Sequence, residues 1–321
     1  MRLIARQIAL PFLLLALATP SLAQSPNTNP VRVIIGYPAG TPVDITGRAL
    51  IEHMQKQLGQ TMIVDLRPGA AGALAINAVI NAEPDGNTIH YGLMSGLIPA
   101  LVKANPVDAR KVLLPISDSV SAPFAMFVSA KTPAKTLKEL VDYSKANPPD
   151  KLNFASAAGT QELLMHALKR RTGLTYTVIN YAGAPAMIPP LIKGEVDLSF
   201  TVLANFFPHI QAGTIRVLFI TGPRRMARLP DVPTAGELGL TDLAGTTSDL
   251  GWWAPRGTPR EVIDRLSRAA IAAVKMPNVT ELLLRMGYDS VASTPEEQLK
   301  RYEANLQFWT DTAKATNFQP Q

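Results

Sequence analysis

The 321-residue sequence contains no cysteine and only four histidines, which are His53, His90, His166 and His209. Without cysteine the chain can form neither a disulfide nor a thiolate metal site, so its folded core alone must hold it together, as is feasible at this length. The histidines are spread along the chain without the spacing of metal ligands. We therefore expect no metal site and no cofactor.

The sequence also lacks the short motifs that mark common active sites. It has no Gly-x-Ser-x-Gly elbow, no Walker loop, no Gly-x-Gly-x-x-Gly motif and no His-Glu-x-x-His motif. The formal net charge of +6 is mild, and the basic residues are dispersed. Their one cluster, Arg224, Arg225 and Arg228, has no interleaved aromatics and is interpreted as a solvated turn. We predict a protein that is not an enzyme and binds no nucleic acid.

The first residues have the pattern of an export signal. Arg2 and Arg6 precede the apolar run "IALPFLLLALA", and Ser21-Leu22-Ala23 forms a small-residue cleavage site. The alternative is a retained membrane anchor, but a run of about 11 residues is short for a bilayer, and there is no lipobox cysteine. We expect residues 1–23 to be a signal peptide cleaved after Ala23, leaving a mature protein that is soluble and exported.

Strand and helix patterns alternate along most of the chain. The predicted strands are 31–37, 61–66, 87–93, 124–129, 152–156, 175–181, 196–202 and 215–222. The predicted helices between them are 42–58, 73–82, 136–146, 161–171, 185–193 and 205–212, and helices 259–275, 277–286 and 295–316 follow. Such alternation indicates an α/β fold with parallel sheets covered by helices on both faces.

The stretch "YPAGTPVD", residues 37–44, joins the first predicted strand to the first helix. Thr41 is a good N-cap, Pro42 suits the first helical position, and Asp44 can reach back to the Thr41 amide. Free amides at the start of a helix beyond a strand end make an anion site. The alternative interpretation is an ordinary turn between a strand and a helix.

A second stretch repeats this arrangement about 120 residues later. Ser156, Ala157, Ala158, Gly159 and Thr160 follow a predicted strand, and Thr160 can cap a helix that begins at residue 161. Ligands of such sheets bind beyond the carboxyl ends of the strands. Two lobes that face each other with these helix starts would clamp an anion.

Other residues leave two interpretations open. Met94 and Ser95 follow the third strand and either face a ligand or pack in the core. Asp197 begins a strand and either contacts a donor group of the ligand or forms a structural cap, with the cap favoured. Trp252 and Trp253 are interpreted as hinge or core packing rather than as a platform for ligand stacking.

Several stretches together resemble the periplasmic substrate-binding receptors of tripartite tricarboxylate transporters, known as Bug proteins, over roughly residues 31–316. They are "YPAGTPVDITGRAL", "LGQTMIVDLRPGAAGALAINAVINAEPDGNTIHYG", "YAGAPAMIPPLIKGEVDLSF", "IQAGTIRVLFITGPRRMARLPDVPTAGELG" and "GWWAPRGTP". The resemblance implies a two-lobed Venus-flytrap fold of type II, with each lobe a sheet flanked by helices. We expect lobe 1 at 30–122 plus 250–321 and lobe 2 at 123–249, with crossings near 120–128 and 245–253.

The resemblance also implies the function. Family members capture small mono-, di- or tricarboxylates, aromatic acids or amino acids and pass them to membrane subunits; we expect the same here from a monomer. One ligand carboxylate is held by two loops, which correspond to Ala39, Gly40 and Thr41 with Asp44, and to residues 156–160. The remaining expected ligand-binding residues are Tyr37, Met94, Ser95, Tyr181, Ala182, Gly183 and Asp197.

The sequence departs from the family in three places. Thr41-Pro42 follows Gly40 where the family has a second glycine, the second loop is shorter, with Leu163 or Leu164 where a His is common, and Ala182 stands where Lys is common. These changes indicate a pocket with fewer polar groups, and the sequence leaves the ligand itself open. Two other classes of function fit: a periplasmic sensor that presents its ligand to a signalling partner, and a secreted α/β enzyme.

Overall fold

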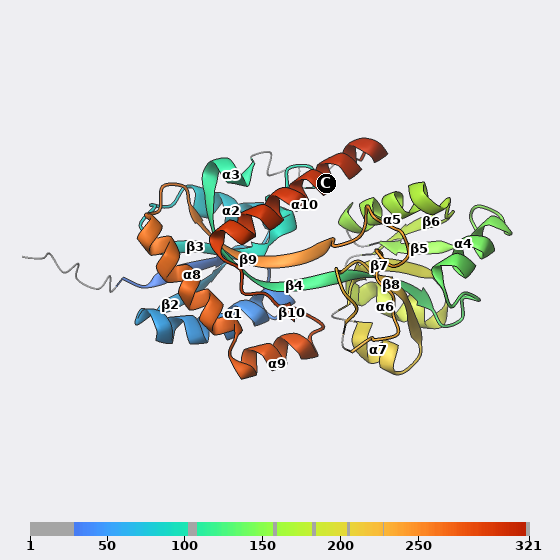
Figure 1. The fold of residues 1–321 in the computed structure, drawn as a ribbon, viewed down its shortest axis with the longest axis horizontal. Helices are drawn as coiled ribbons and strands as arrows, with labels where there is room; N and C mark the ends of the chain where they lie inside the picture. Colours follow the sequence, from blue (N-terminus) through green and yellow to red (C-terminus); the bar gives the residue numbers. More distant parts are fainter. Residues whose placement is uncertain are drawn as a thin grey trace, which may run out of the picture.

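The structure is a computed structural model that describes residues 29–101, 108–156, 159–181, 184–203, 206–226 and 228–318. The predicted signal peptide lies outside these residues. In the part described, two halves lie side by side, each a sheet flanked by helices (Figure 1). None of the helices in these ranges is long and apolar enough to cross a membrane.

Lobe 1 is named here as the half that contains the first strands of the chain. Its strands are β1 (Val31–Ile35), β2 (Met62–Leu66), β3 (Thr88–Leu93), β9 (Thr247–Pro255) and β10 (Asp289–Ser290). Its helices are α1 (Pro42–Leu58), α2 (Ala73–Ile80), α3 (Ala109–Val112), α8 (Arg260–Val274), α9 (Pro277–Arg285) and α10 (Pro295–Thr316), with short 3-10 turns η1 (Ala70–Gly72) and η2 (Met94–Leu97).

Lobe 2 contains the other parallel strands. Its strands are β5 (Asn153–Ser156), β6 (Thr177–Asn180), β7 (Leu198–Val202) and β8 (Ile215–Ile220). Its helices are α4 (Leu137–Lys145), α5 (Gly159–Thr172), α6 (Ala184–Lys193) and α7 (Phe207–Gln211). The strand β4 (Leu113–Ser129) belongs to both lobes and joins their sheets into one path, in the order β2-β1-β3-β9-β4-β7-β5-β6.

The two lobes are joined by β4 and β9, which run side by side between them (Figure 1). From Leu113 to Pro123, β4 pairs antiparallel with β9, and from Phe124 onward it pairs antiparallel with β7 and β8. The strand therefore changes sheets between Pro123 and Phe124. The expectation of parallel sheets was wrong for these pairings, because a strand that crosses between lobes and one that returns must run in opposite directions.

The sequence prediction placed the crossings near 120–128 and 245–253, within or close to β4 and β9, but it missed most of the strands that form them. It placed a strand only at 124–129 and none at 247–255, since "LLPISDSVSAP" is rich in serine and proline rather than in β-branched residues. In the structure Ser117, Ser119 and Ser121 are buried. The hydroxyls of Ser117 and Ser121 donate to Ser293 O at 2.8 Å and to Asp249 Oδ1 at 2.6 Å, so long-range hydrogen bonds make this polar strand part of the core.

The helix α10 is a third connection between the lobes. Arg301 and Tyr302 bond it to lobe 1, and Trp309, only 1% exposed, packs edge-on against Phe124 with ring centroids 6.1 Å apart. One hydrophobic cluster contains Met94 and Leu97 of lobe 1 together with Leu163 and Leu164 of α5. Helix α10 contacts helices and strands of both halves, so it does not mark a boundary between them. The lobe limits given above stay a prediction.

Arg228 makes a further contact between the lobes. Its guanidinium lies 3.6 Å from the centroid of the Phe207 ring in α7. Its Nη1 donates to the backbone oxygen of Leu284, near the end of α9, at 2.7 Å. A cation is favourable at a helix C-terminus, so Arg228, which is exposed as predicted, also ties α7 to α9.

Several local predictions are confirmed. Helix α1 spans 42–58 and ends at Gly59, whose φ of 63° is the left-handed conformation that favours glycine. Helix α10 spans 295–316 and begins with a capping box between Thr294 and Glu297. Trp252 and Trp253 are buried, and Trp252 Nε1 donates to Ser119 Oγ at 2.8 Å, so both tryptophans pack in the core.

His90 of β3 makes folding stability depend on pH. It is 2% exposed, its Nδ1 donates to Ile34 O at 3.0 Å, and burial lowers the pKa of the ring from 6.5 to about 4. The unfolded chain therefore takes up this proton at a higher pH than the folded protein. Stability is lost as the pH falls below 6.5 toward 4.

We predict that the titration of His90 lowers the unfolding free energy by about 2 kcal/mol when the pH is lowered from 7 to 5. Urea unfolding at both pH values should show a smaller loss in His90→Gln, because this variant has no ring to protonate. His209→Gln, at a less buried position, is the matched control and should behave like the wild type. An equal loss in wild type and His90→Gln would contradict the prediction.

Candidate functional site

The loop after β1 has the predicted position but different hydrogen bonds. Thr41 occupies the N-cap of α1 in an extended conformation, with Pro42 as the first helical residue. Its hydroxyl does not cap the helix; it donates instead to Pro38 O at 2.8 Å. The expected capping bond was wrong because the loop offers a carbonyl acceptor three residues back, and this bond closes the turn instead.

Asp44 folds back onto the loop, as expected, but onto another amide. Its Oδ2 accepts from Gly40 N at 2.9 Å rather than from the Thr41 amide, and its Oδ1 accepts from Arg48 Nε at 2.7 Å. Asp44 is 4% exposed and the Arg48 side chain is 53% exposed. Both carboxylate oxygens are therefore bonded, and an arginine balances the charge of Asp44 beside the helix start.

The backbone donors of this loop are partly occupied. The Gly40 amide is bonded to Asp44, and the Thr41 amide lies 3.4 Å from Pro38 O. Pro42 has no N–H, and the amides of Val43 and Asp44 belong to the first turn, which has no helical acceptor. The donors that this conformation leaves for an anion are thus those of the first turn of α1.

Tyr37, within this loop, and Met94, which follows the neighbouring strand β3, lie in different environments. The Tyr37 hydroxyl lies near Gly72, where an added Cβ would be 3.8 Å from it, and burial raises the pKa of Tyr37 to about 12. Met94 is 2% exposed within the hydrophobic cluster that joins the lobes, which favours packing for this residue. Ser95, by contrast, is partly exposed.

The second loop is described only in part, because Ala157 and Ala158 lie outside the described residues. Ser156 ends β5, is fully buried, and has its hydroxyl 3.4 Å from Glu162 Oε1. Helix α5 begins at Gly159, so Thr160 lies in the first turn instead of capping a helix that starts at 161. Gln161 Nε2 donates to Thr201 Oγ1 at 2.9 Å, which fixes this turn to β7.

The C-terminal end of α10 lies against the start of α5. Asn317 ends α10 with a φ of 52° and turns the chain back, and the Phe318 ring then approaches Gly159 so closely that an added Cβ would be 2.4 Å from its Cζ. Sequence reasoning did not find Phe318, because nothing in its local pattern indicates a contact across 159 residues of chain. The second candidate loop thus rests on a helix anchored in lobe 1.

Tyr181 and Asp197 lie at opposite ends of the parallel strands of lobe 2. Tyr181 follows β6, and its amide donates to Ser156 O at 2.8 Å; Ala182 and Gly183 lie outside the described residues. Asp197 accepts from Asn153 N at 2.9 Å and lies 3.4 Å from Thr132 Oγ1. Asn153 begins β5 and Ser156 ends it, so Asp197 lies at the opposite end of this strand from Ser156. There it has the role of a structural cap that we favoured.

Two of the predicted groups, the loop before α1 and the start of α5, lie where a helix starts beyond the carboxyl end of a parallel strand, whereas Asp197 lies at the other end of β5. α1 follows β1 and α5 follows β5, and both helix starts offer backbone amides and a positive dipole end to an anion. Within the described residues no group of three or more His, Cys, Asp or Glu side chains could hold a metal ion. The arrangement is suited to holding an anion.

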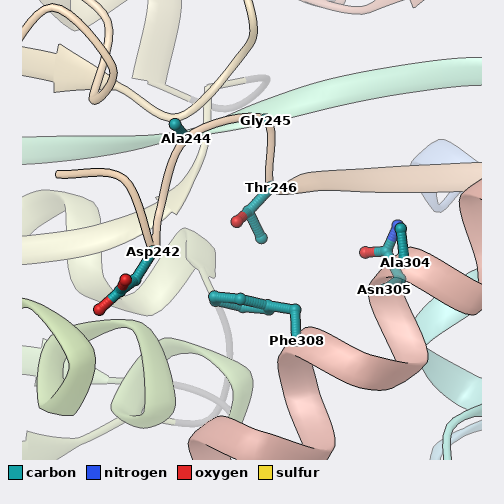
Figure 2. Close-up of a pocket in the computed structure, with 7 residues that line it drawn as sticks. All are labelled: Asp242, Ala244, Gly245, Thr246, Ala304, Asn305 and Phe308. Carbon is teal, nitrogen blue, oxygen red and sulfur yellow. The ribbon is translucent and has the colours of Figure 1, made fainter.

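A separate small pocket lies beside the crossing strands (Figure 2). Its volume is about 120 Å³, and it opens between the segment that leads into β9 and one face of α10. Its lining residues are Asp242, Ala244, Gly245, Thr246, Ala304, Asn305 and Phe308. None of the predicted ligand-binding residues lines it, and Asp242 is already paired with Arg171 of α5.

Comparison with known proteins agrees with this arrangement. Residues 46–316 match the family described as Tripartite tricarboxylate transporter family receptor. A UPF0065 protein of Bordetella bronchiseptica is 34% identical over 299 residues, which cover 92% of this chain and 88% of the relative. The protein BugT of Bordetella pertussis is 27% identical over 307 residues, covering 94% of this chain and 93% of BugT.

Solved structures have the same fold. The periplasmic binding protein BugD shares 28% identity at a TM-score of 0.73, over 91% of this chain and 99% of its own. An R. palustris protein solved with adipate shares 26% identity at a TM-score of 0.77, over 92% of this chain and 99% of its own. MatC of Rhodopseudomonas palustris with bound malate shares 26% identity at a TM-score of 0.71, over 88% of this chain and 98% of its own. These structures confirm the predicted two-lobed α/β binding-protein fold.

We predict that Gly159→Ala destabilises the protein through Phe318. The added methyl group would lie 2.4 Å from the ring, so overpacking should cost roughly 1–3 kcal/mol of unfolding free energy. In a Phe318→Ala background the same substitution should cost much less, which a double-mutant cycle measures. Gly236→Ala is the matched control, because its methyl meets neighbours at an ordinary 3.7 Å. An equal cost in both backgrounds would show that the contact is unimportant.

Proposed function

The chain belongs to the family of tripartite tricarboxylate transporter receptors, and from this premise we propose that it captures a small organic carboxylate between its two lobes in the periplasm. The observation that carries the proposal is the pair of helix starts, α1 and α5, at the carboxyl ends of β1 and β5. Similar proteins solved with adipate and malate support a carboxylate ligand. The bound acid is then delivered to the membrane subunits of such a transporter.

The ligand carboxylate is bound by backbone groups of the two helix starts. The amides of the first turn of α1 provide one side, with Tyr37, residues 39–41 and Ser95 nearby, and Ser156, Gly159 and Thr160 provide the other. Each helix dipole adds about 0.3–1 kcal/mol when exposed and more when water is excluded. For the Thr41 hydroxyl to donate to a ligand, it must first leave Pro38 O.

Asp44 acts as a structural cap in this proposal and does not touch the anion. An ionised aspartate that pointed at a carboxylate would repel it. Here its two oxygens hold the Gly40 amide and Arg48 Nε, and the guanidinium balances its charge. Arg48 stands four residues after Asp44, the usual spacing of a helical ion pair.

Location, oligomeric state and the absence of catalysis belong to the same proposal. We propose that residues 1–23 are removed on export after Ala23 and that the mature receptor works as a monomer. Relatives and structural neighbours named as binding proteins support binding rather than catalysis. Export can be tested by sequencing the N-terminus of the mature protein, which should begin at Gln24.

A thermal-shift screen over carboxylic acids tests the proposed ligand class. We expect at least one small mono-, di- or tricarboxylate to raise the melting temperature, because a ligand at 100 times its Kd stabilises the folded state by about 2.7 kcal/mol. The corresponding amides, which lack the negative charge, are the matched controls and should give no shift. If only neutral or cationic compounds stabilised the protein, the proposed anion site would be wrong.

Variants of Asp44 test its role as a cap. Asp44→Ala should lower the unfolding free energy by roughly 1 kcal/mol, because the Gly40 amide loses its acceptor and Arg48 its partner. Asp44→Asn keeps an acceptor for Gly40 and should still bind the acid found in the screen, as isothermal titration will show. Asp65→Asn, which removes the ion pair of Asp65 on β2 with Arg67, is the control. Loss of binding in Asp44→Asn with an unchanged melt would mean that Asp44 contacts the ligand directly.

A further inference from the structure

A buried charge cluster lies where β4, β9 and α10 meet. Asp118 of β4 and Asp249 of β9 are 0% and 1% exposed. Arg301 of α10 bonds to both, with Nε 3.1 Å from Asp118 Oδ2 and Nη2 2.8 Å from Asp249 Oδ1. Ser121 Oγ also donates to Asp249 Oδ1, at 2.6 Å. The cluster therefore joins both crossing strands to the helix that reaches lobe 2.

The charges of this cluster do not balance if both aspartates are ionised. Two carboxylates would then face one guanidinium, and the cluster would carry one uncompensated negative charge. The second oxygen of each carboxylate, Asp118 Oδ1 and Asp249 Oδ2, is buried without a hydrogen-bond partner among the described residues. An ionised oxygen buried without a donor is costly, so the cluster lacks one positive charge and a donor.

We propose that Asp118 and Asp249 together bind one proton at neutral pH, which makes the junction of β4, β9 and α10 a proton-binding site. The bound proton supplies both the missing positive charge and the missing donor. Burial, and then the charge of Asp249, raise the pKa of Asp118 well above its usual value, while Arg301 and the side-chain amide of Gln298 oppose this rise. The two carboxylates share the guanidinium of Arg301, so a proton on either one balances the charge of the pair.

Other groups around the pair do not replace this proton. On β3, Tyr91 lies near Asp118, but its hydroxyl donates to Thr46 Oγ1 at 3.0 Å. On β10, Asp289 is in register with Ser121 and would only add negative charge. The α8 residues buried against the sheet are small or apolar, with Ser267 the polar one. Within the described residues, Arg301 is the one cation bonded to the pair.

Gly251 shows how closely the cluster is packed. A Cβ at this position would lie 2.5 Å from Asp118 Oδ1 and 2.6 Å from Gln298 Nε2, so glycine leaves room for a carboxyl and an amide. Gln298 Nε2 donates to Trp252 O at 3.2 Å, and its Oε1 is a further buried acceptor without a partner in the described part of the chain. Gln298 thus lies beside the free oxygen of Asp118 and opposes the rise of its pKa, but its own Oε1 still lacks a donor among the described residues.

The position of the site gives the proton a structural effect. The cluster lies just before β4 changes sheets, and it anchors α10, whose far end contacts the start of α5. Above pH 4 the folded state holds a proton that the unfolded chain has lost. Because the pKa of Asp118 is raised, stability is lost as the pH rises from the range of a free aspartate through that raised pKa. We expect alkaline pH to loosen the attachment of α10 to the crossing strands.

Infrared spectroscopy can detect the proton directly. At pH 7 the wild type should show the C=O stretch of a buried protonated carboxyl, and this band should disappear at alkaline pH and be absent from Asp118→Asn. Urea unfolding between pH 6 and pH 9 should show a loss of stability in the wild type and a flatter profile in Asp118→Asn. This range lies mostly above the titration of His90. Asp197→Asn, which alters an aspartate whose oxygens both have donors, is the control and should keep the wild-type profile.

Two results would overturn the proposal. One is the absence of a protonated carboxyl band at pH 7 together with parallel stability profiles of wild type and Asp118→Asn, which would mean that both aspartates are ionised. The other is stabilisation by Na⁺ but not by K⁺ at constant ionic strength, without the band, which would place a metal cation there instead. Arg301→Met should strengthen the band; if this variant does not fold, the Asp118→Asn spectra decide alone.

Discussion

The pairing of β4 with β9 is the constraint on which the rest of this structure depends. The two strands are joined from Leu113 with Pro255 to Pro123 with Thr247, and β4 then continues into the second sheet. Because they run between the lobes in opposite directions, they fix how the two sheets lie relative to each other. Their surroundings are polar as well as apolar, so buried serines and aspartates need partners from distant parts of the chain.

Helix α10 completes this connection and relates it to the candidate site. Arg301 holds the helix to the crossing strands, Trp309 packs on Phe124, and Phe318 contacts Gly159 at the start of α5. A hydrophobic cluster shared by both lobes surrounds this path. An interface of this kind limits how freely two lobes can move. Any closure around a ligand must therefore rearrange α10 or bend the crossing strands.

Local features of the fold could be predicted from the sequence because local chemistry determines them. Thr41-Pro42 and Gly59 mark the two ends of α1, and the Thr294–Glu297 capping box marks the start of α10. The polar half of β4 could not be predicted in the same way. Its side chains bond to residues more than a hundred positions away, and no local pattern shows such partners.

The candidate site shows the same division. The sequence placed the helix starts at Thr41 and near Thr160, but it assigned Asp44 to the wrong amide and did not include Arg48 or Phe318. Arg48 could have been found from its spacing to Asp44, whereas Phe318 and the Gln161–Thr201 bond depend on the tertiary fold.

The central claim is that one ligand carboxylate lies between the starts of α1 and α5. A crystal structure of the protein with the acid that stabilises it most tests this claim directly. The account predicts a carboxylate within hydrogen-bonding distance of backbone amides from both helix starts, with Asp44 still bonded to the Gly40 amide. An acid bound in the pocket between residues 242–246 and α10, or one that contacts the Asp44 carboxylate, would contradict it.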